Sequence, residues 1–485
     1  MKISIDKSSK VPVYLQIADQ IKAQIISGAL PRSSALPSER ALAQILDVHR
    51  NTVVKAYGEL KSDAWIESRQ GVGYLVASAS TEKEPVGESG EGVQMGRVNW
   101  VNEVADKYLD MEKTFDDLFQ RFTDESHFSL GSGIASREVY SSERVAHDIA
   151  GLLTGSGPSQ YFFSPYKGDR FLRQKLASFL GTKGVRASSG EIQILSETNQ
   201  ALDFIVTLLV KPGDSVVMEE PVHPDMYRVM ELAGARILTV PVDEDGMNCD
   251  VLESLLTQTR PRLIFVNSSF HDPTGCILSL ERRKKLVELS SRYRIPIVEE
   301  DAASELVYDG DKLPPIKAFD TTGNVIYIYS FSLTFIPGLS LAFVTGNRDF
   351  VRALSYLVSV RLMASDWMTQ KLLGMYLDDG SYYSSLATFR EIYSGNRDLV
   401  CQKLDALAHL GVRYERPRGG VYVWCRLPDG VDSKHFINRA YNMGVTLIPG
   451  HVFYPYKNGG RDYIRINYSY ESRERLACGM DVLHK

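Results

Sequence analysis

Basic side chains are concentrated at the start of this 485-residue chain. Residues 1–76 hold 10 Lys and Arg residues against 7 Asp and Glu residues, whereas the whole chain has a formal net charge of −5. The other 409 residues therefore carry a net charge of −8. Basic side chains neutralise phosphate groups, and a mildly basic module on an acidic body is typical of a small DNA-binding domain joined to a larger sensor or enzyme.

Three helices and a hairpin must position these basic side chains. The run Val13–Ile26 has apolar residues at helical spacing and predicts the first helix. Ser38 is the expected N-cap of a second helix, and Asp47–His49 is a short turn before a third helix that begins at Arg50. Two helices joined by such a turn form a helix-turn-helix. The alternating stretch Trp65–Val76 predicts a β-hairpin, which would form a wing.

This arrangement is similar to the GntR family of winged-helix regulators. His49 stands where that family usually has serine, and Ala64 stands where it usually has glycine. The resemblance implies that residues 1–76 bind double-stranded operator DNA. It is carried by the motifs Leu36-Pro-Ser-Glu-Arg40, Leu42-Ala43, Val48-x-Arg50, Thr52-Val53, Ala56-Tyr57, Leu60 and Arg69-Gln-Gly71-x-Gly73.

The resemblance also implies which residues contact DNA. Arg40 and Arg50 would contact phosphates or guanine edges, while the hairpin tip would reach the minor groove or the backbone. Glycine at the tip permits that close approach. The alternative, open for Arg40 or Lys55 taken singly, is that the charges only solvate a small helical domain. The expected contact set is Arg40, Arg50, Asn51, Thr52, Lys55, Arg69, Gln70, Gly71 and Gly73.

Residues 77–104 are predicted to be a flexible linker. Their first part is rich in Gly, Ser and Glu and poor in large apolar residues, which is typical of a tether without specific contacts of its own. Strand-like and helix-like segments then alternate through residues 105–485, as in Glu191–Leu195, Ser215–Glu219 and Leu263–Asn267. This alternation predicts an α/β body with a mostly parallel sheet.

Signatures along the body resemble, in their order, the fold-type-I aminotransferase domain. That domain has a mostly parallel central sheet and a smaller C-terminal α+β subdomain. A GntR head, a linker and such a body together make the MocR subfamily of regulators, and the resemblance covers nearly the whole chain. The matching residues are Tyr161, Gly168-Asp169, Leu172-Arg173, Gln200-Ala-Leu, Pro212-Gly-Asp, Glu220-Pro221, Asp272-Pro-Thr-Gly275, Glu300-Asp301, Pro337-Gly-Leu339, Arg418-Gly-Gly420, Pro449-Gly450, Phe453 and Tyr463-Ile-Arg465.

The same resemblance locates a site for pyridoxal phosphate (PLP), and several of its positions are changed. The stretch Tyr329–Val344 corresponds to a family pattern close to Ser-Phe-Ser-Lys-Thr followed by Pro-Gly-Leu-Arg. Leu333 stands at the position of the lysine that forms the Schiff base, and Ser340 stands at the position of an arginine that binds the phosphate. Lys317 lies too far upstream to replace the lysine by a shift of register.

Further changes surround these two. Glu197 places a carboxylate in the helix N-terminus that normally holds the phosphate, and Ala302 and Ala303 replace the tyrosine expected after Asp301. One substitution alone would fit an engineered lysine replacement, whereas all of them together indicate a site that has lost covalent PLP. We therefore expect a pseudo-aminotransferase with no enzymatic activity, no catalytic residue and no cofactor. Non-covalent PLP binding is the alternative.

Other residues of the site are retained. Arg465 matches the family arginine that pairs with a substrate carboxylate, and Asp301 can accept a hydrogen bond from a ring N–H or an ammonium group. We expect a remodelled pocket for a small carboxylate-bearing effector. The alternatives are that Asp301 is a helix or loop cap and that Arg465 forms a structural ion pair. The candidate effector-binding residues are His223, His271, Asp301, Ser332, Leu333, Ser340 and Arg465.

Composition restricts the other function classes. The 5 cysteines are scattered without Cys-x-x-Cys spacing, so neither a disulfide framework nor a zinc site is indicated and a reducing cytoplasm is expected. No apolar run has the length of a membrane span, and the N-terminus lacks a signal sequence.

The sequence is compatible with three functions. The first is a cytoplasmic transcription regulator whose body forms a homodimer, in the family's manner a head-to-tail exchange, and senses an effector. The second is an active PLP aminotransferase with an accessory head. The third is a regulator whose body is only a dimerisation scaffold. The missing lysine opposes the second function, and the retained Arg465 and Asp301 oppose the third.

Overall fold

The computed structural model describes most of the chain and separates into two compact units, Met1–Asp110 and Met111–Lys485. The predicted linker lies outside the described residues, apart from Ala77. The described residues are 3–5, 12–26, 29–31, 34–62, 65–69, 73–77, 126–136, 138–155, 165–336, 338–362, 366–456 and 459–484. We call residues 1–76 the head and residues 105–485 the body, and each is described by itself.

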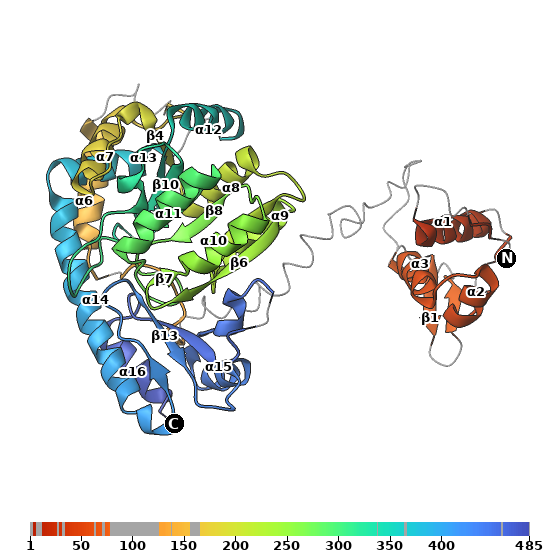
Figure 1. Cartoon of the computed structure of the whole chain (residues 1–485). Helices are drawn as coiled ribbons and strands as arrows, with labels where there is room; N and C mark the ends of the chain where they lie inside the picture. The colour runs from red at the N-terminus through yellow and green to blue at the C-terminus, as the bar shows by residue number, and fades with distance from the viewer. Residues whose placement is uncertain are drawn as a thin grey trace. The chain divides into compact units, whose positions relative to one another are not determined.

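The head contains the predicted helices and hairpin (Figure 1). Its elements are α1 (Val13–Ile26), α2 (Glu39–Leu46), α3 (Arg50–Ser62), β1 (Ile66–Arg69) and β2 (Gly73–Val76). The three helices enclose an apolar core that includes Ile17, Ile21, Leu42, Val53 and Leu60. This confirms the winged helix-turn-helix fold.

Local signals fix the boundaries of the two central helices of the head. The Ser38 hydroxyl accepts a hydrogen bond from the backbone N–H of Ala41 at 3.2 Å and caps α2. Asp47 ends α2 in the left-handed region, at a φ of 50°, and thereby turns the chain toward α3. The Tyr57 hydroxyl of α3 donates to the carbonyl of Pro37 at 2.8 Å, which locks the two helices together.

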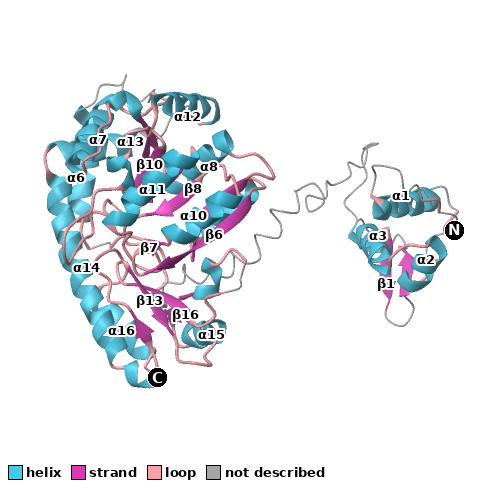
Figure 2. Ribbon diagram, in the orientation of Figure 1, coloured by secondary structure: helices cyan, strands magenta, loops and turns pink. Residues whose placement is uncertain are grey.

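The body is built on an eight-stranded sheet flanked by helices (Figure 2). The strand order is β4-β11-β10-β9-β8-β5-β6-β7, and the pairs from β10 to β6 are all parallel. β11 is antiparallel to both of its neighbours. The strands are β4 (Ile192–Leu195), β5 (Ser215–Glu220), β6 (Arg236–Asp243), β7 (Gly246–Met247), β8 (Ile264–Asn267), β9 (Ile297–Asp301), β10 (Val325–Ser330) and β11 (Ala342–Thr345).

Helices cover both faces of this sheet, and successive strand residues alternate between two cores. Val216 and Met218 pack with α8, α9 and α12, whereas Val217 packs with α10 and α11. Among the described residues, no helix combines the length and apolar character needed to cross a membrane. The helices are α6 (Ser142–Gly155), α7 (Arg170–Thr182), α8 (Thr198–Leu209), α9 (Pro224–Leu232), α10 (Cys249–Gln258), α11 (Leu280–Tyr293), α12 (Arg348–Arg361) and α13 (Trp367–Asp378).

A smaller C-terminal subdomain completes the body. Its antiparallel sheet has the order β12-β13-β16-β15, and a short parallel pair joins β14 to β3. Helix α14 runs from the large sheet to this subdomain, where it contacts α16 (Figure 1). The elements are β3 (Phe128–Ser129), α14 (Ser381–Asp405), β12 (Arg413–Tyr414), β13 (Tyr422–Arg426), α15 (Ser433–Asn442), β14 (Val445–Thr446), β15 (Ile448–Pro449), β16 (Tyr463–Asn467) and α16 (Arg473–Val482). The predicted α/β body with a C-terminal α+β subdomain is confirmed.

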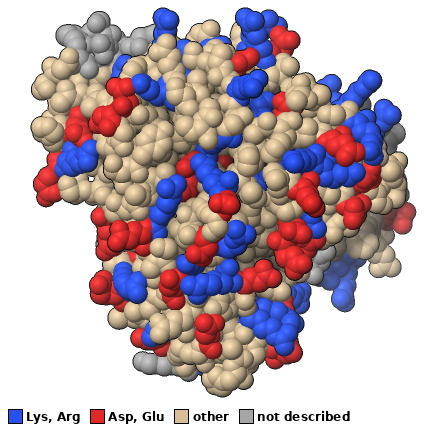
Figure 3. Space-filling model, turned by 60° about the vertical axis from the view of Figure 1, so that its left-hand side comes forward, with Lys and Arg blue, Asp and Glu red and all other residues tan. Residues whose placement is uncertain are grey.

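Charge is mixed over the body surface. Figure 3 shows lysine and arginine side chains interspersed with aspartate and glutamate side chains over the face in view. Exposed ion pairs of the body, among them Arg292 with Glu288 and Arg416 with Asp398, likewise combine the two charges. A mixed surface of this kind offers no extended basic area to a DNA backbone on that face.

Candidate functional site

The N-terminus of α3 carries an arginine held by a carboxylate. Arg50 donates to Glu39 Oε2 from Nε at 3.3 Å and from Nη2 at 2.9 Å. The other oxygen of Glu39 accepts a hydrogen bond from the Tyr74 hydroxyl at 3.1 Å. Glu39 therefore ties the start of α2 to the start of α3 and to the wing. The sequence predicted a DNA contact for Arg50, but it did not indicate the roles of Glu39 and Tyr74.

The remaining predicted DNA-contacting residues lie on the same part of the head or outside the described residues. Arg40, Asn51 and Lys55 are exposed and Thr52 is half-buried. Gly73 begins β2 with a φ of 98°, a conformation that favours glycine. Gln70, Gly71 and the side chain of Arg69 lie outside the described part of the wing.

The body contains a cavity of about 160 Å³ at the carboxyl ends of its parallel strands. Open parallel sheets bind ligands at this edge. Strands β8 and β9 contribute Asn267 and Glu300, and β13 of the C-terminal subdomain contributes Tyr422. The other lining residues are Gly133, Thr198, Val222, His223, Met226, Phe265, Phe270, Asp272, Ala302, Ala303, Ser332 and Leu333.

Of the two neighbouring acids at the end of β9, Glu300 lines the cavity and the predicted Asp301 does not. Neighbouring residues of a strand point to opposite faces of the sheet, so only one of the two can face the cavity. Asp301 instead accepts hydrogen bonds from the Tyr327 hydroxyl at 2.5 Å and from the Ser304 backbone N–H at 2.9 Å. It also lies 3.7 Å from Nζ of the buried Lys183. The predicted ligand role of Asp301 is corrected accordingly.

Glu300 is enclosed by protein and by other acids. Its Oε2 accepts a hydrogen bond from the Asn267 side-chain amide. Burial, followed by the nearby carboxylates of Asp301 and Asp272, raises the pKa of Glu300 to about 8.

Arg465 is not available to a ligand in the way the sequence predicted. Its Nη1 lies 2.7 Å from each carboxylate oxygen of Asp272, and its Nη2 donates to the carbonyl of Gly131 at 2.9 Å. The guanidinium also lies 4.2 Å from the ring centre of Tyr422. Burial opposes ionisation of Asp272, but the charges of Arg465 and His223 hold the pKa of its carboxyl below the usual value. The alternative of an internal ion pair describes Arg465 in this structure.

The two predicted histidines lie in different places. His223 caps α9, accepting the Asp225 backbone N–H at Nδ1, and lines the cavity with Nε2 3.8 Å from Asp272. His271 is buried and does not line it, because its Nε2 lies 3.6 Å from Glu219 and its Nδ1 lies 2.9 Å from the Thr274 hydroxyl. Burial lowers the pKa of His271 to about 4, so the ring is neutral at pH 7. The predicted pocket role of His271 is corrected.

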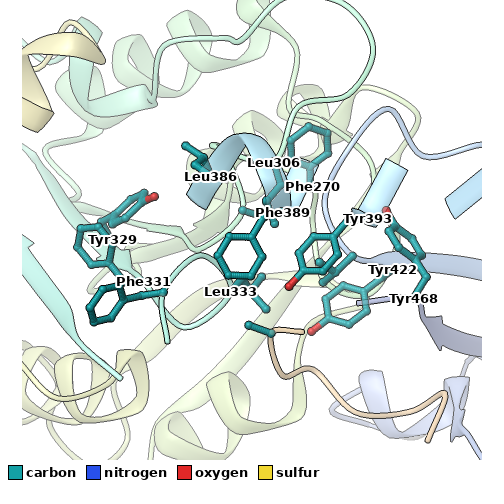
Figure 4. Close-up of a cluster of buried hydrophobic side chains, with 14 of the residues drawn as sticks. Phe270, Leu306, Tyr329, Phe331, Leu333, Leu386, Phe389, Tyr393, Tyr422 and Tyr468 are labelled. Carbon is teal, nitrogen blue, oxygen red and sulfur yellow. The ribbon is translucent and has the colours of Figure 1, made fainter. Parts of the chain in front are cut away.

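The loop after β10 contributes an apolar wall. Leu333 and Ser332 line the cavity, whereas the half-buried Ser340 does not. Leu333 belongs to a buried cluster with Phe331, Phe389 and Tyr422, which Figure 4 shows around it. Of the predicted residues of this loop, Ser332 and Leu333 therefore lie at the cavity and Ser340 lies outside its lining.

The lining does not fit covalently held PLP. None of the described residues around the cavity is a lysine or an arginine, so no amine is placed for a Schiff base and no guanidinium for a phosphate. The buried Lys183 lies outside the lining, and its Nζ is bound to Glu305 and to the Ser304 hydroxyl, each at 2.6 Å.

Family comparisons agree with the two-part fold. Residues 125–481 match the family described as aminotransferase class I and II. Residues 13–76 match the family described as bacterial regulatory proteins, gntR family. The two matches correspond to the body and to the head.

Individual relatives fall into two kinds. The probable rhizopine catabolism regulatory protein MocR of Rhizobium meliloti is 28% identical, over 92% of this chain and 88% of its own. The 2-aminoadipate transaminase of Thermus thermophilus is 30% identical, over 73% of this chain and 88% of its own. A crystal structure of Pyrococcus horikoshii kynurenine aminotransferase has a TM-score of 0.75 and 27% identity, over 79% of this chain and 96% of its own.

These relatives correct the prediction that the protein is not an enzyme. Named aminotransferases match the body as closely as a named regulator does, in sequence and in fold. The changed positions around Leu333 therefore do not by themselves class the body as inactive. Membership, in contrast, is clear: the chain belongs to the aminotransferase class I and II family in its body and to the gntR family in its head, the combination that defines MocR-type transcription regulators.

Proposed function

We propose that this protein regulates transcription as a homodimer whose body senses a small molecule in the cavity beside Glu300. The observation that carries the proposal is the presence, in one chain, of a gntR-family head and an enzyme-like body with a ligand-sized cavity. Membership of the gntR family implies DNA binding. Beyond DNA binding, the proposal adds that the protein dimerises, senses an effector and acts in the cytoplasm.

In the head, Arg50 stands at the N-terminus of α3, where a recognition helix of this kind contacts base edges. Its pairing with Glu39 presets the direction of the guanidinium. The side chain remains 52% exposed, so Arg50 can exchange the carboxylate for a phosphate or a guanine edge. Arg40 and Lys55 would add phosphate contacts, which give affinity rather than sequence preference.

In the body, the cavity has walls from two parts of the fold. Glu300 and Asn267 come from the large sheet, whereas Tyr422 comes from the C-terminal subdomain. A ligand in contact with both parts favours the arrangement in which both contacts are made, and that preference can alter the spacing of two heads in a dimer. A head-to-tail dimer would bring each head against its partner's body.

Electrophoretic mobility shift with DNA from upstream of the protein's own gene tests this function. We expect a sequence-specific, salt-sensitive complex that Arg50→Ala weakens, because counterion release and base contacts both depend on basic side chains. The absence of any specific complex at low salt would contradict the proposal. Sedimentation of the full chain separates the dimer from a monomer.

A second candidate is an aminotransferase, or a PLP-responsive regulator, that binds PLP without a covalent bond. The observation that favours it is the 30% identity with a named transaminase over 73% of this chain. Absorbance after addition of PLP, followed by borohydride reduction and a transamination assay, tests this candidate. Turnover of an amino donor would establish it, and unchanged spectra with no turnover would exclude it.

A further inference from the structure

One oxygen of a carboxylate in the cavity has no hydrogen-bond partner in the part of the chain that the structure describes. Glu300 is only 7% exposed, and its Oε2 is bound to Asn267. Its Oε1 makes no hydrogen bond with any residue in the described part of the chain, and the side chain lines the cavity. Oε1 is not one of the fully buried atoms, so it is open to the cavity, and a ligand in the cavity that supplies a donor can form a hydrogen bond with it.

Arg465 does not supply that donor. Its guanidinium is hydrogen-bonded to the Asp272 carboxylate and to the carbonyl of Gly131, and it does not line the cavity. The Asp272 carboxylate thereby takes the place that a ligand's carboxylate would need on this guanidinium. A ligand with its own carboxylate would also meet Glu300 and Asp272, both negative when ionised, without a free lysine or arginine among the described lining residues.

Much of the rest of the wall is apolar or aromatic. Phe270, Tyr422 and Leu333 line the same cavity as Glu300, and an aromatic face attracts a cation as well as a hydrocarbon chain. The other titratable groups in the lining are Asp272, His223 and Tyr422, and His223 lies 3.8 Å from Asp272. Of the two acids in the lining, Asp272 is paired with Arg465, whereas no cation of the described residues forms an ion pair with Glu300.

We propose that the cavity binds a small organic cation, a protonated amine or a protonated nitrogen heterocycle without a carboxylate, with Glu300 Oε1 as its hydrogen-bond acceptor and counter-ion. Asn267 is a positioning residue, because it fixes the other oxygen of Glu300. Asp272 sets the specificity against carboxylates through its hold on Arg465. This inference rests on the proposed effector site and names the ligand class.

Three probes that differ at one group test the ligand class on the full chain. Isobutylamine carries the cation, isobutanol is its neutral counterpart, and valine is the same amine with an added carboxylate. Saturation-transfer NMR and calorimetry at pH 8.5, above the pKa of about 8 for Glu300, should show that isobutylamine binds about tenfold or more tightly than either of the others, the scale of one charge-assisted hydrogen bond. Valine binding as tightly as isobutylamine, or isobutanol doing so, would overturn the proposal.

Variants assign the binding to the two carboxylates. Glu300→Gln should lose about tenfold or more in isobutylamine affinity, whereas Glu281→Gln, at an exposed position on α11 outside the lining, should not change it. Asp272→Asn should release Arg465 and raise the affinity for valine. If Glu300→Gln does not fold, the proposal is still tested by the valine affinity of Asp272→Asn and by the relative affinities of the three probes for the wild type. Unchanged isobutylamine affinity in a folded Glu300→Gln variant would overturn the proposal.

The same preparations distinguish this inference from the proposed function. A specific DNA complex without amine-selective binding would contradict the ligand class and leave DNA-binding regulation in place. Amine-selective binding without a DNA complex would support the ligand class and contradict the regulatory function.

Discussion

The head and the body each contain an arginine bound to a carboxylate, and the two pairs differ in how far they are exposed to solvent. In the head, the Arg50 side chain is 52% exposed and that of Glu39 is 18% exposed. In the body, Arg465 is 3% exposed and Asp272 is 15% exposed. An exposed pair is weak and exchanges readily, whereas breaking a buried pair leaves an uncompensated charge. The first arginine is therefore free to change partners, and the second is not.

The largest effect should come from breaking the buried pair. Arg465→Met leaves Asp272 without its cation beside Glu300, and we expect a loss of about 3 to 5 kcal/mol in the free energy of unfolding. Urea unfolding followed by tryptophan fluorescence measures it. The matched variant Arg50→Met should lose less than about 1 kcal/mol. Equal losses of stability in the two variants would contradict the claim that the buried pair contributes more to the fold than the exposed pair.

Glu300 extends the comparison to a buried acid that no lysine or arginine of the described residues neutralises. The pKa of the Glu300 carboxyl is raised from its ordinary value of 4.5 to about 8 in the folded protein. Protonation of Glu300 therefore contributes stability to the fold, and this contribution is complete below about pH 4.5. That stabilisation is lost as the pH rises through about 8.

Glu300→Gln should therefore be more stable than the wild type by on the order of 2 to 4 kcal/mol at pH 8.5, with little difference at pH 4.5. Thermal and urea unfolding of both proteins at the two pH values measures this gap. A gap that is constant with pH would mean that Glu300 does not titrate in this range.

A smaller effect is expected on DNA rather than on stability. Arg50→Ala should weaken operator binding by about 1 to 3 kcal/mol, because a bidentate contact to a base is lost. Lys55→Ala should instead weaken binding to all sequences alike and reduce the salt dependence. Fluorescence anisotropy with specific and scrambled DNA separates the two effects. An Arg50→Ala variant with full sequence preference would contradict the base-contact role.

The smallest effect concerns the tie between the helices and the wing. Tyr74→Phe removes the hydroxyl that donates to Glu39 and should cost less than about 1 kcal/mol in DNA affinity, since Glu39 keeps its bond to Arg50. Anisotropy at low salt resolves such a change. A loss larger than that of Arg50→Ala would mean that the wing, rather than Arg50, dominates recognition.

Much of the fold was predictable because its signals are local. Ser38 caps α2, the Val13–Ile26 stripe forms α1, and alternating segments of the body become parallel strands. The site was harder to predict. All five residues of β9 are buried, so no polar and apolar alternation indicates whether Glu300 or Asp301 faces the cavity.

Contacts between distant residues were the other limit. Arg465 and Asp272 are 193 residues apart, and no local pattern indicates that one binds the other. The pairing of Arg50 with Glu39 spans only 11 residues, yet the motif that contains Glu39 gave a role to Arg40 alone. In both places the sequence singled out the arginine and could not identify its carboxylate partner.

The measurement that tests the account most directly is equilibrium binding of the full-length protein to fluorescent upstream DNA, compared with its Arg50→Ala variant. We expect specific, salt-sensitive binding by the wild type and a loss of about tenfold or more in the variant, with an unchanged unfolding midpoint. Equal binding by the two proteins, or no preference for the upstream sequence over scrambled DNA, would contradict the account.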